Sequence, residues 1–269
     1  MAGNALAVVH DADDLDDETM HAFARETRLS ETTFVQSATE EGADYRNRIW
    51  TVVEELPFAG HPSLGTAVAV ARARGETGKL RYVQQTGAGL QPIEVTLNGA
   101  GASASMLQGP PTFGVEIDIE SALKPLGLQP SAADPYLHPQ VVSTGLPQII
   151  VPLRSIEHLA AITPDFSAIQ DLVEPLAAFG IYAAHCDPVA GTAQARYFYR
   201  DVRVAEDPAT GSAAGPLCAY LSRHAGFPSV EITQGVEMGR PSCLRAKAVD
   251  GEIWVSGDVV VVVDGVVRL

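Results

Sequence analysis

Two short turns, each leading into an apolar helix, hold the residues of this sequence that are best suited to chemistry. The first turn contains Gly60 and His61, and the second contains Thr210, Gly211 and Ser212. A helix that begins at a glycine presents free backbone N–H groups and the positive end of its dipole, and no side chain keeps an anion away. If they face one another, two such helix starts would hold a small carboxylate or an enolate-like intermediate.

Three side chains near these turns are candidate acid/base or polarising groups. Glu31 precedes a predicted strand, His61 lies in the first turn, and Asp207 comes just before Pro208 in the second. Each also has an ordinary structural explanation: a glutamate at a strand start is commonly solvated, a histidine can cap a helix, and Asp-Pro initiates turns. The occurrence of two matching turns favours a functional interpretation of the turns, whereas His61 and Asp207 fit both explanations equally and Glu31 alone is weak evidence for chemistry.

The two turns belong to an internal repeat in which Gly60 corresponds to Gly211. In each half a strand precedes the turn, and an apolar helix and another strand follow it. These elements are expected at residues 48–53, 62–74 and 82–87 in the first half, and at 196–204, 212–224 and 230–235 in the second. The halves differ at Glu31, which has no acidic counterpart.

The repeat extends upstream, because segments 3–9 and 145–151 are similar and each enters a helix-forming stretch, 11–28 or 156–178. We therefore predict an α/β (α+β) fold of two similar lobes, with the active site between them. Each lobe would wrap a mixed, mostly antiparallel sheet around a central buried helix. The first lobe would span 1–112, with a C-terminal strand at 258–269 that can complete it, and the second 113–257. A linker is expected near 108–115.

Composition narrows the class of protein. The chain has 269 residues, 46% of them hydrophobic, and a formal net charge of −15, so nucleic acid and anionic membranes are disfavoured partners. Its longest apolar run, near Val259 to Val263, is too short to span a membrane and predicts a strand. The cysteine spacings and the absence of a signal-peptide pattern at the start predict a cytoplasmic protein.

No motif for a cofactor or metal ion is recognisable. The acidic run 11–18 lacks the glycine and terminal glutamate of an EF-hand, and the chain has no dinucleotide fingerprint, P-loop or paired metal histidines. We expect chemistry without cofactors or metals, on a small anionic metabolite.

Six segments together resemble the PhzF-like phenazine-biosynthesis isomerase family over nearly the whole chain. They are residues 3–13, 29–35, 56–67, 143–147, 207–215 and 234–242. The resemblance implies that Glu31 is the acid/base that moves a proton, and that His61 and Asp207 bind and polarise the substrate and tune the protonation of Glu31. It also implies a cleft lined by Gly60, Gly211 and Ser212, to which Thr210 adds a hydroxyl. The family's defining reaction is isomerisation of trans-2,3-dihydro-3-hydroxyanthranilate, and its members are commonly homodimers.

Two alternatives follow from the same resemblance. The wider fold group contains diaminopimelate epimerase and proline racemase, which use a cysteine from each lobe, whereas the two turns here contain no cysteine. Two-thiol racemisation is therefore disfavoured. The other alternative is a non-catalytic protein that binds small molecules with the same two lobes. Relatives usually begin with an extra strand before the segment matching Gly3 and Asn4, and have proline where this chain has Ala5. Either the first lobe lacks this strand, which would leave an open sheet edge, or the natural chain starts further upstream.

Overall fold

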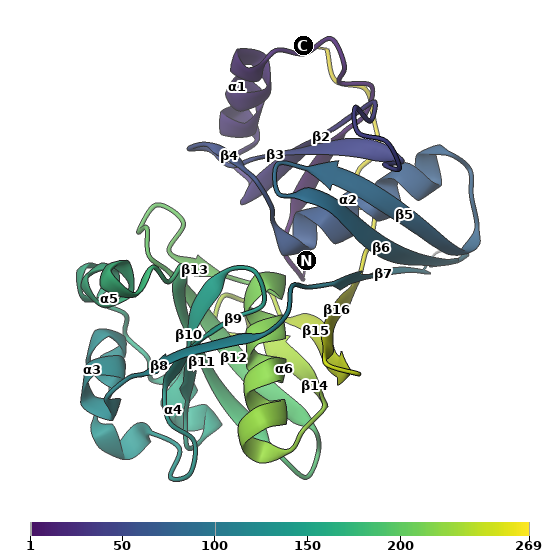
Figure 1. The fold of residues 1–269 in the computed structure, drawn as a ribbon. Coiled ribbons are helices and arrows are strands. Elements are labelled where there is room, and N and C mark those ends of the chain that lie inside the picture. Colours follow the sequence, from purple (N-terminus) through teal and green to yellow (C-terminus); the bar gives the residue numbers. More distant parts are fainter. Residues whose placement is uncertain (1, 100, 269) are drawn as a thin grey trace. The chain divides into compact units, whose positions relative to one another are not determined.

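The computed structural model describes residues 2–99 and 101–268, which group into two compact units (Figure 1). The first lobe comprises Ala5–Leu107 and the segment from Ser256 onward, and the second comprises Gln108–Val255 and the residues up to Asn4. The predicted bounds, 1–112 and 113–257, differ at residues 2–4 and 108–112, which group with the second lobe, and at 256–257, which group with the first. None of the helices in the described residues is long and apolar enough to cross a membrane.

The first lobe carries a mixed sheet whose strands lie in the order β1, β2, β3, β5, β6, β7, with the short β4 beside β3. Its elements are β1 (Leu6–Val9), α1 (Asp17–Thr27), β2 (Glu31–Gln36), β3 (Tyr45–Trp50), β4 (Glu55–Leu56), α2 (Gly60–Ala73), β5 (Gly78–Thr86), β6 (Gly89–Asn98) and β7 (Gly101–Leu107).

The second lobe repeats this arrangement and adds two strands at one edge, giving the order β8, β9, β10, β11, β12, β14, β15, β16, with β13 beside β12. Its elements are β8 (Thr112–Glu116), α3 (Ile119–Leu123), β9 (Gln140–Ser143), β10 (Pro147–Pro152), α4 (Ile156–Ala160), α5 (Phe166–Val173), β11 (Gly180–Asp187), β12 (Thr192–Tyr199), β13 (Glu206–Asp207), α6 (Gly211–Ala225), β14 (Ser229–Gln234), β15 (Ser242–Val249) and β16 (Glu252–Asp258).

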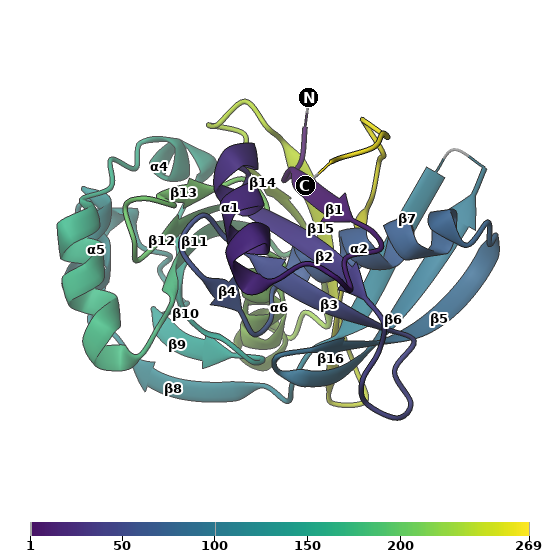
Figure 2. The same cartoon turned by 90° about the horizontal axis from the view of Figure 1, so that it is seen from above.

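Strand pairing reproduces the repeat and confirms the predicted fold class. The pairs β1–β2 and β10–β11 are both parallel, as are β3–β5 and β12–β14. The pairs β2–β3, β5–β6, β11–β12 and β14–β15 are all antiparallel. The predicted central helices correspond to α2 and α6, which lie along the sheets of their own lobes (Figure 2).

Part of each sheet is buried on both faces, whereas β14 and β15 alternate buried and exposed residues, because neighbouring residues of a strand point to opposite sides. In β10, Ile150 packs with α6 in one core, whereas Ile149 and Val151 pack in a second core with α3, α4 and α5. The first lobe does the same, with one core around α2 and a smaller one around Met20 of α1 and Phe34 of β2. Central helices that are apolar nearly all round therefore sit in fully buried layers.

Several predicted elements are wrong in detail. No strand forms at Val259 to Val263, and Val260 and Val263 are 76% and 85% exposed. The stretch 156–178 is not one helix but α4 and α5 separated by a turn. The predicted linker 108–115 contains most of β8, which pairs with β9. Trp50 is buried, while Trp254 is only partly buried.

Candidate active site

The first lobe brings Glu31 and His61 together. Glu31 is the first residue of β2 and His61 the second residue of α2, and His61 Nε2 lies 3.3 Å from Glu31 Oε2. Their side chains are 16% and 21% exposed, so both are largely shielded from water yet reachable. Two residues that lie 30 positions apart in the sequence thus come into contact in the first lobe.

Burial lowers the pKa of His61 to about 4, and a hydrogen bond with the backbone of Ala5 opposes this shift only in part. Near neutral pH the imidazole is therefore uncharged. A neutral imidazole has one ring nitrogen that donates and one that accepts. His61 can therefore donate a hydrogen bond to a Glu31 carboxylate or, in its other tautomer, accept one from a protonated Glu31.

Asp207 lies in the second lobe, in β13, beside the start of α6. Its Oδ1 accepts a hydrogen bond from Asn4 Nδ2 at 2.7 Å, and its Oδ2 accepts one from the Thr210 hydroxyl at 2.5 Å. Burial raises the pKa of Asp207 to about 6, although these hydrogen bonds and one from the Ala209 backbone lower it. The pKa of Asp207 is therefore closer to neutral pH than the pKa of an ordinary carboxyl group.

The two helix starts are built as the sequence indicated. Gly60 and Gly211 are buried first residues of α2 and α6, and neither helix has a side-chain cap among the described residues. The N-cap residue Thr210 could cap α6, but its hydroxyl donates to Asp207 instead. Ser212 follows at a partly exposed position. Both helices thus start without a side-chain acceptor for their first N–H groups.

Strand register explains why Glu31 has no acidic counterpart. Thr32 pairs with Trp50 in the first lobe as Ile181 pairs with Phe198 in the second, so Glu31 corresponds to Gly180. A side chain at Gly180 would meet the carbonyl oxygen of Phe198 and the hydroxyl of Tyr197. The Tyr197 ring occupies the space that a second acid would need, so only the first lobe supplies a glutamate at this position.

Replacing Gly180 by Ala should lower the free energy of unfolding by about 2 kcal/mol or more, because the new methyl group has no room against a backbone oxygen. Urea unfolding followed by circular dichroism measures the change. Gly101→Ala is the matched control, because a methyl group at that strand position meets only an ordinary contact of 3.6 Å. Equal stabilities of the two variants would show that the close contact at Gly180 has been misjudged.

An ion pair lies at the base of each turn and was not predicted from the sequence. In the first lobe Arg48 binds Glu55 and also Asp17 at 2.9 Å. In the second, Arg196 Nε and Nη2 each donate to Glu206 at 2.8 Å. The sequence contains a pattern that could have indicated these ion pairs, because both copies of the repeat have an arginine in the strand and a glutamate at the turn.

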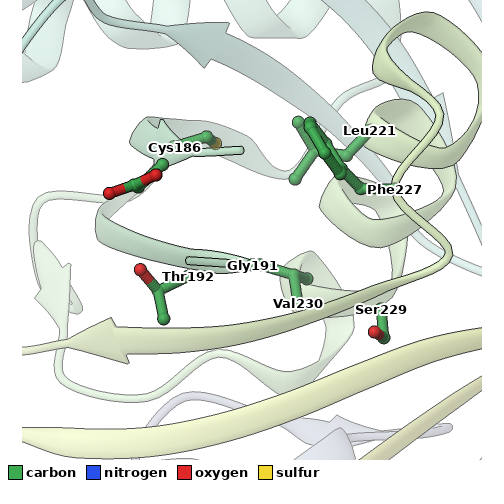
Figure 3. Close-up of a pocket in the computed structure, with 8 residues that line it drawn as sticks. Cys186, Gly191, Thr192, Leu221, Phe227, Ser229 and Val230 are labelled. Carbon is green, nitrogen blue, oxygen red and sulfur yellow. The ribbon is translucent and has the colours of Figure 1, made fainter. Parts of the chain in front are cut away.

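A recess in the second lobe lies apart from the predicted site residues (Figure 3). Its lining comes from Cys186, Asp187, Gly191, Thr192, Leu221, Phe227, Ser229 and Val230. Burial raises the pKa of Cys186 to about 12, so its thiol stays protonated and is a poor nucleophile. Nothing in this recess resembles an acid/base site.

The two shifted pKa values predict opposing effects of pH on stability. His61 has a folded-state pKa below its usual 6.5, so it makes the protein less stable as pH falls from about 6.5 to 4. Asp207 has a folded-state pKa above its usual 3.8, so its contribution is largest below pH 4 and is lost as pH rises to about 6. Between pH 4 and 6 the two terms should largely cancel.

Urea unfolding at several pH values separates these terms. Asp207→Asn should lose stability on acidification more steeply than the unmodified protein, and His61→Gln should become relatively more stable in acid. Parallel stability curves for all three proteins would contradict the assigned pKa shifts.

Comparison with known proteins first defines the class. The fold is shared with a hydroxyproline epimerase from Agrobacterium vitis, with a TM-score of 0.60 at 13% identity over 91% of this chain and 80% of that one. A solved structure titled a predicted epimerase, from Pseudomonas aeruginosa, has a TM-score of 0.83 at 32% identity over 98% of this chain and 95% of that one. The molecule thus has the two-lobed fold of these solved structures.

Residues 1–265 match the model of the PhzC-PhzF family, described as phenazine biosynthesis-like protein, and the chain belongs to this family. It is 41% identical to the trans-2,3-dihydro-3-hydroxyanthranilate isomerase of Pseudomonas aeruginosa over 92% of this chain and 86% of that protein. The enzyme of the same name from Pseudomonas fluorescens is also 41% identical, over 92% and 86%. The predicted family, fold and isomerase class are confirmed, whereas the roles of individual residues stay predictions.

Proposed function

We propose that this protein is an isomerase that shifts a proton within a small carboxylated metabolite, with Glu31 as base and then as acid. The observation that carries the proposal is the contact of Glu31 with a neutral His61, 3.3 Å apart and largely buried. The corresponding position of the second lobe is Gly180, which has no acidic side chain. This favours a single acid that acts on one face of the substrate.

In the proposed reaction the Glu31 carboxylate takes a proton from a substrate carbon, and the electron pair of that C–H bond moves into an adjoining unsaturated system. The protonated Glu31 then returns the proton to another carbon of the same system, so no atom is lost. His61 stays neutral beside Glu31 and keeps its carboxyl group aligned during both steps.

Substrate binding is assigned to polar groups at the helix starts. We propose that the backbone N–H groups at each helix start, near Gly60 in the first lobe and near Gly211 and Ser212 in the second, can bind a carboxylate, because helix starts stabilise negative charge. Asp207, with Thr210 beside it, would bind and polarise an amine or hydroxyl group. The substrate of the relatives, trans-2,3-dihydro-3-hydroxyanthranilate, is the first compound to test.

The test is a proton NMR assay in heavy water with that compound and a panel of small unsaturated or hydroxylated acids. We expect isomerisation of at least one acid, in the presence of a chelator and without added cofactor. If Glu31 returns the proton that it removes, part of the substrate hydrogen should remain in the product. Binding of these acids, seen as thermal stabilisation without turnover or exchange, would instead establish the alternative of a non-catalytic binding protein.

The expected homodimer is a separate proposal. The exposed valines of segment 259–267 offer apolar surface for a partner copy, and Val260, Val262, Val263 and Val266 are each more than 60% exposed. Light scattering at several protein concentrations tests this, and a stable monomer throughout would remove the expectation.

A further inference from the structure

We propose that Gln234 is a positioning residue for Asp207: it turns the Thr210 hydroxyl toward one oxygen of the Asp207 carboxyl group, while Asn4 holds the other. The consequence for turnover rests on the proposed function. The hydrogen-bond arrangement itself belongs to the second lobe and can be measured without any substrate.

The orientation of the Gln234 amide is fixed by its partners. The backbone N–H of Thr210 can only donate, and it donates to Gln234 Oε1 at 3.2 Å; the Tyr182 hydroxyl donates to the same oxygen at 2.9 Å. Gln234 Nε2 must then point to the other side, where the backbone carbonyl of Asp207 accepts from it at 2.7 Å. Gln234 is completely buried, so water does not compete for these bonds.

The same Nε2 group sets the direction of the Thr210 hydroxyl. Gln234 Nε2 donates to Thr210 Oγ1 at 2.9 Å, so the hydroxyl proton must point elsewhere. Asp207 Oδ2 lies 2.5 Å from Thr210 Oγ1 and receives that proton. Gln234 does not contact the carboxyl group of Asp207. Through Thr210 it nevertheless determines that Asp207 Oδ2 accepts a hydrogen bond.

The second oxygen of Asp207 is held from the start of the chain. Asn4 Nδ2 donates to Asp207 Oδ1 at 2.7 Å and to the carbonyl of Ala209 at 3.3 Å, and both partners can accept. The backbone carbonyl of the preceding residue, Gly3, accepts from Arg240 Nε at 2.9 Å. Asn4 is thus anchored within the second lobe, and both carboxyl oxygens of Asp207 are engaged by donors.

The neighbouring titratable groups do not supply a competing charge. Tyr182 of β11 and Tyr197 of β12 interact electrostatically with Asp207, and burial keeps the pKa of each phenol well above its usual 10. Both are neutral, and their hydroxyls donate to Gln234 and Gln148. The charged form of Asp207 is therefore stabilised mainly by the donors from Asn4 and Thr210, against the cost of burial.

The turn after β14 brings Gln234 into this position. Gly235 has a φ of +80°, and a side chain there would lie 2.7 Å from the carbonyl oxygen of Pro208 and 2.6 Å from that of Arg240. The end of β14 can therefore approach the residue next to Asp207 because glycine occupies this place.

Titration of the Asp207 carboxyl carbon by ¹³C NMR, assigned with Asp207→Asn, tests the proposal in the full chain. Gln234→Met keeps the side-chain volume but cannot orient Thr210, and Gln234→Glu replaces the donor by an acceptor. We expect either variant to raise the titration midpoint of Asp207 by about one pH unit, since a hydrogen bond to a charged group is lost or weakened. Thr210→Val should cause a similar shift, and combining it with Gln234→Met should add little.

Gln84→Met is the matched control. Gln84 is also completely buried and bonded to Ser63, Asn47 and Gln91, but it lies in the first lobe. The control should cost similar stability and leave the Asp207 midpoint unchanged. An unchanged midpoint in both Gln234 variants, or full additivity with Thr210→Val, would overturn the proposal. Because no substrate is present, a failure of the proposed function would not affect this result.

Discussion

Replacing Glu31 by Gln should reduce turnover by about two to four orders of magnitude, the usual contribution of a positioned general acid or base. Glutamine keeps the shape of the side chain and can still contact His61, but it cannot take up and return a proton. Substrate affinity should change much less, so the loss should appear in kcat rather than in KM. Steady-state kinetics with the best substrate from the NMR screen measures both constants.

Two controls make this result specific. Glu94→Gln removes an exposed carboxylate from β6 of the same lobe and should leave kcat unchanged. Circular dichroism and urea unfolding of Glu31→Gln should show an intact fold. Near-normal turnover by this variant would reject Glu31 as the base and leave His61 or Asp207 as the leading candidate.

The second large effect concerns stability. Arg196→Leu should lower the free energy of unfolding by about 3 kcal/mol, because it leaves the carboxylate of Glu206 largely buried without its partner. The side chains of Arg196 and Glu206 are only 8% and 18% exposed, and Arg196 also donates to the carbonyls of Leu159 and Ile162. Urea unfolding at neutral pH measures the loss.

The matched control is Arg203→Leu, which breaks a pair with Asp201 at the surface, where Arg203 is 62% exposed. Exposed pairs are worth between zero and about 1 kcal/mol. The double variant Arg196→Leu, Glu206→Leu should recover part of the lost stability, since only the weaker partner Glu237, 3.9 Å from Arg196, then loses its ion pair. A loss from Arg196→Leu no larger than that of the control would show that the pair contributes little.

The elements that could be predicted from the sequence are those that occur twice in its internal repeat. Both turns, the buried helices after them and the strands on either side recur at matching places, and the pairing of β1–β2 and β10–β11 follows the same match. The uniqueness of Glu31 was also visible. Its cause was not, because the ring of Tyr197 fills the corresponding space from a neighbouring strand.

Other features depend on contacts that sequence spacing does not encode. Asn4 and Asp207 are 203 positions apart, so their hydrogen bond could not be inferred from local pattern. The valines of 259–263 have strong β propensity, but propensity describes how well a residue fits a paired, half-buried strand. The structure places no strand there, and the segment stays largely exposed.

Strand β1 at the edge of the first lobe has fewer neighbouring strands than its counterpart β10 in the second lobe, and this difference affects local motion. In the second lobe β10 is flanked by β9, whereas β1 pairs with β2 alone among the strands that the structure describes. Backbone amides of an edge strand open at a lower free-energy cost than those of a central one. Leu6 lies opposite Glu31 in the register of β1 and β2. Amide exchange should therefore be faster in β1, beside the proposed base, than in β10, and transient fraying of β1 would loosen the geometry on which proton transfer depends.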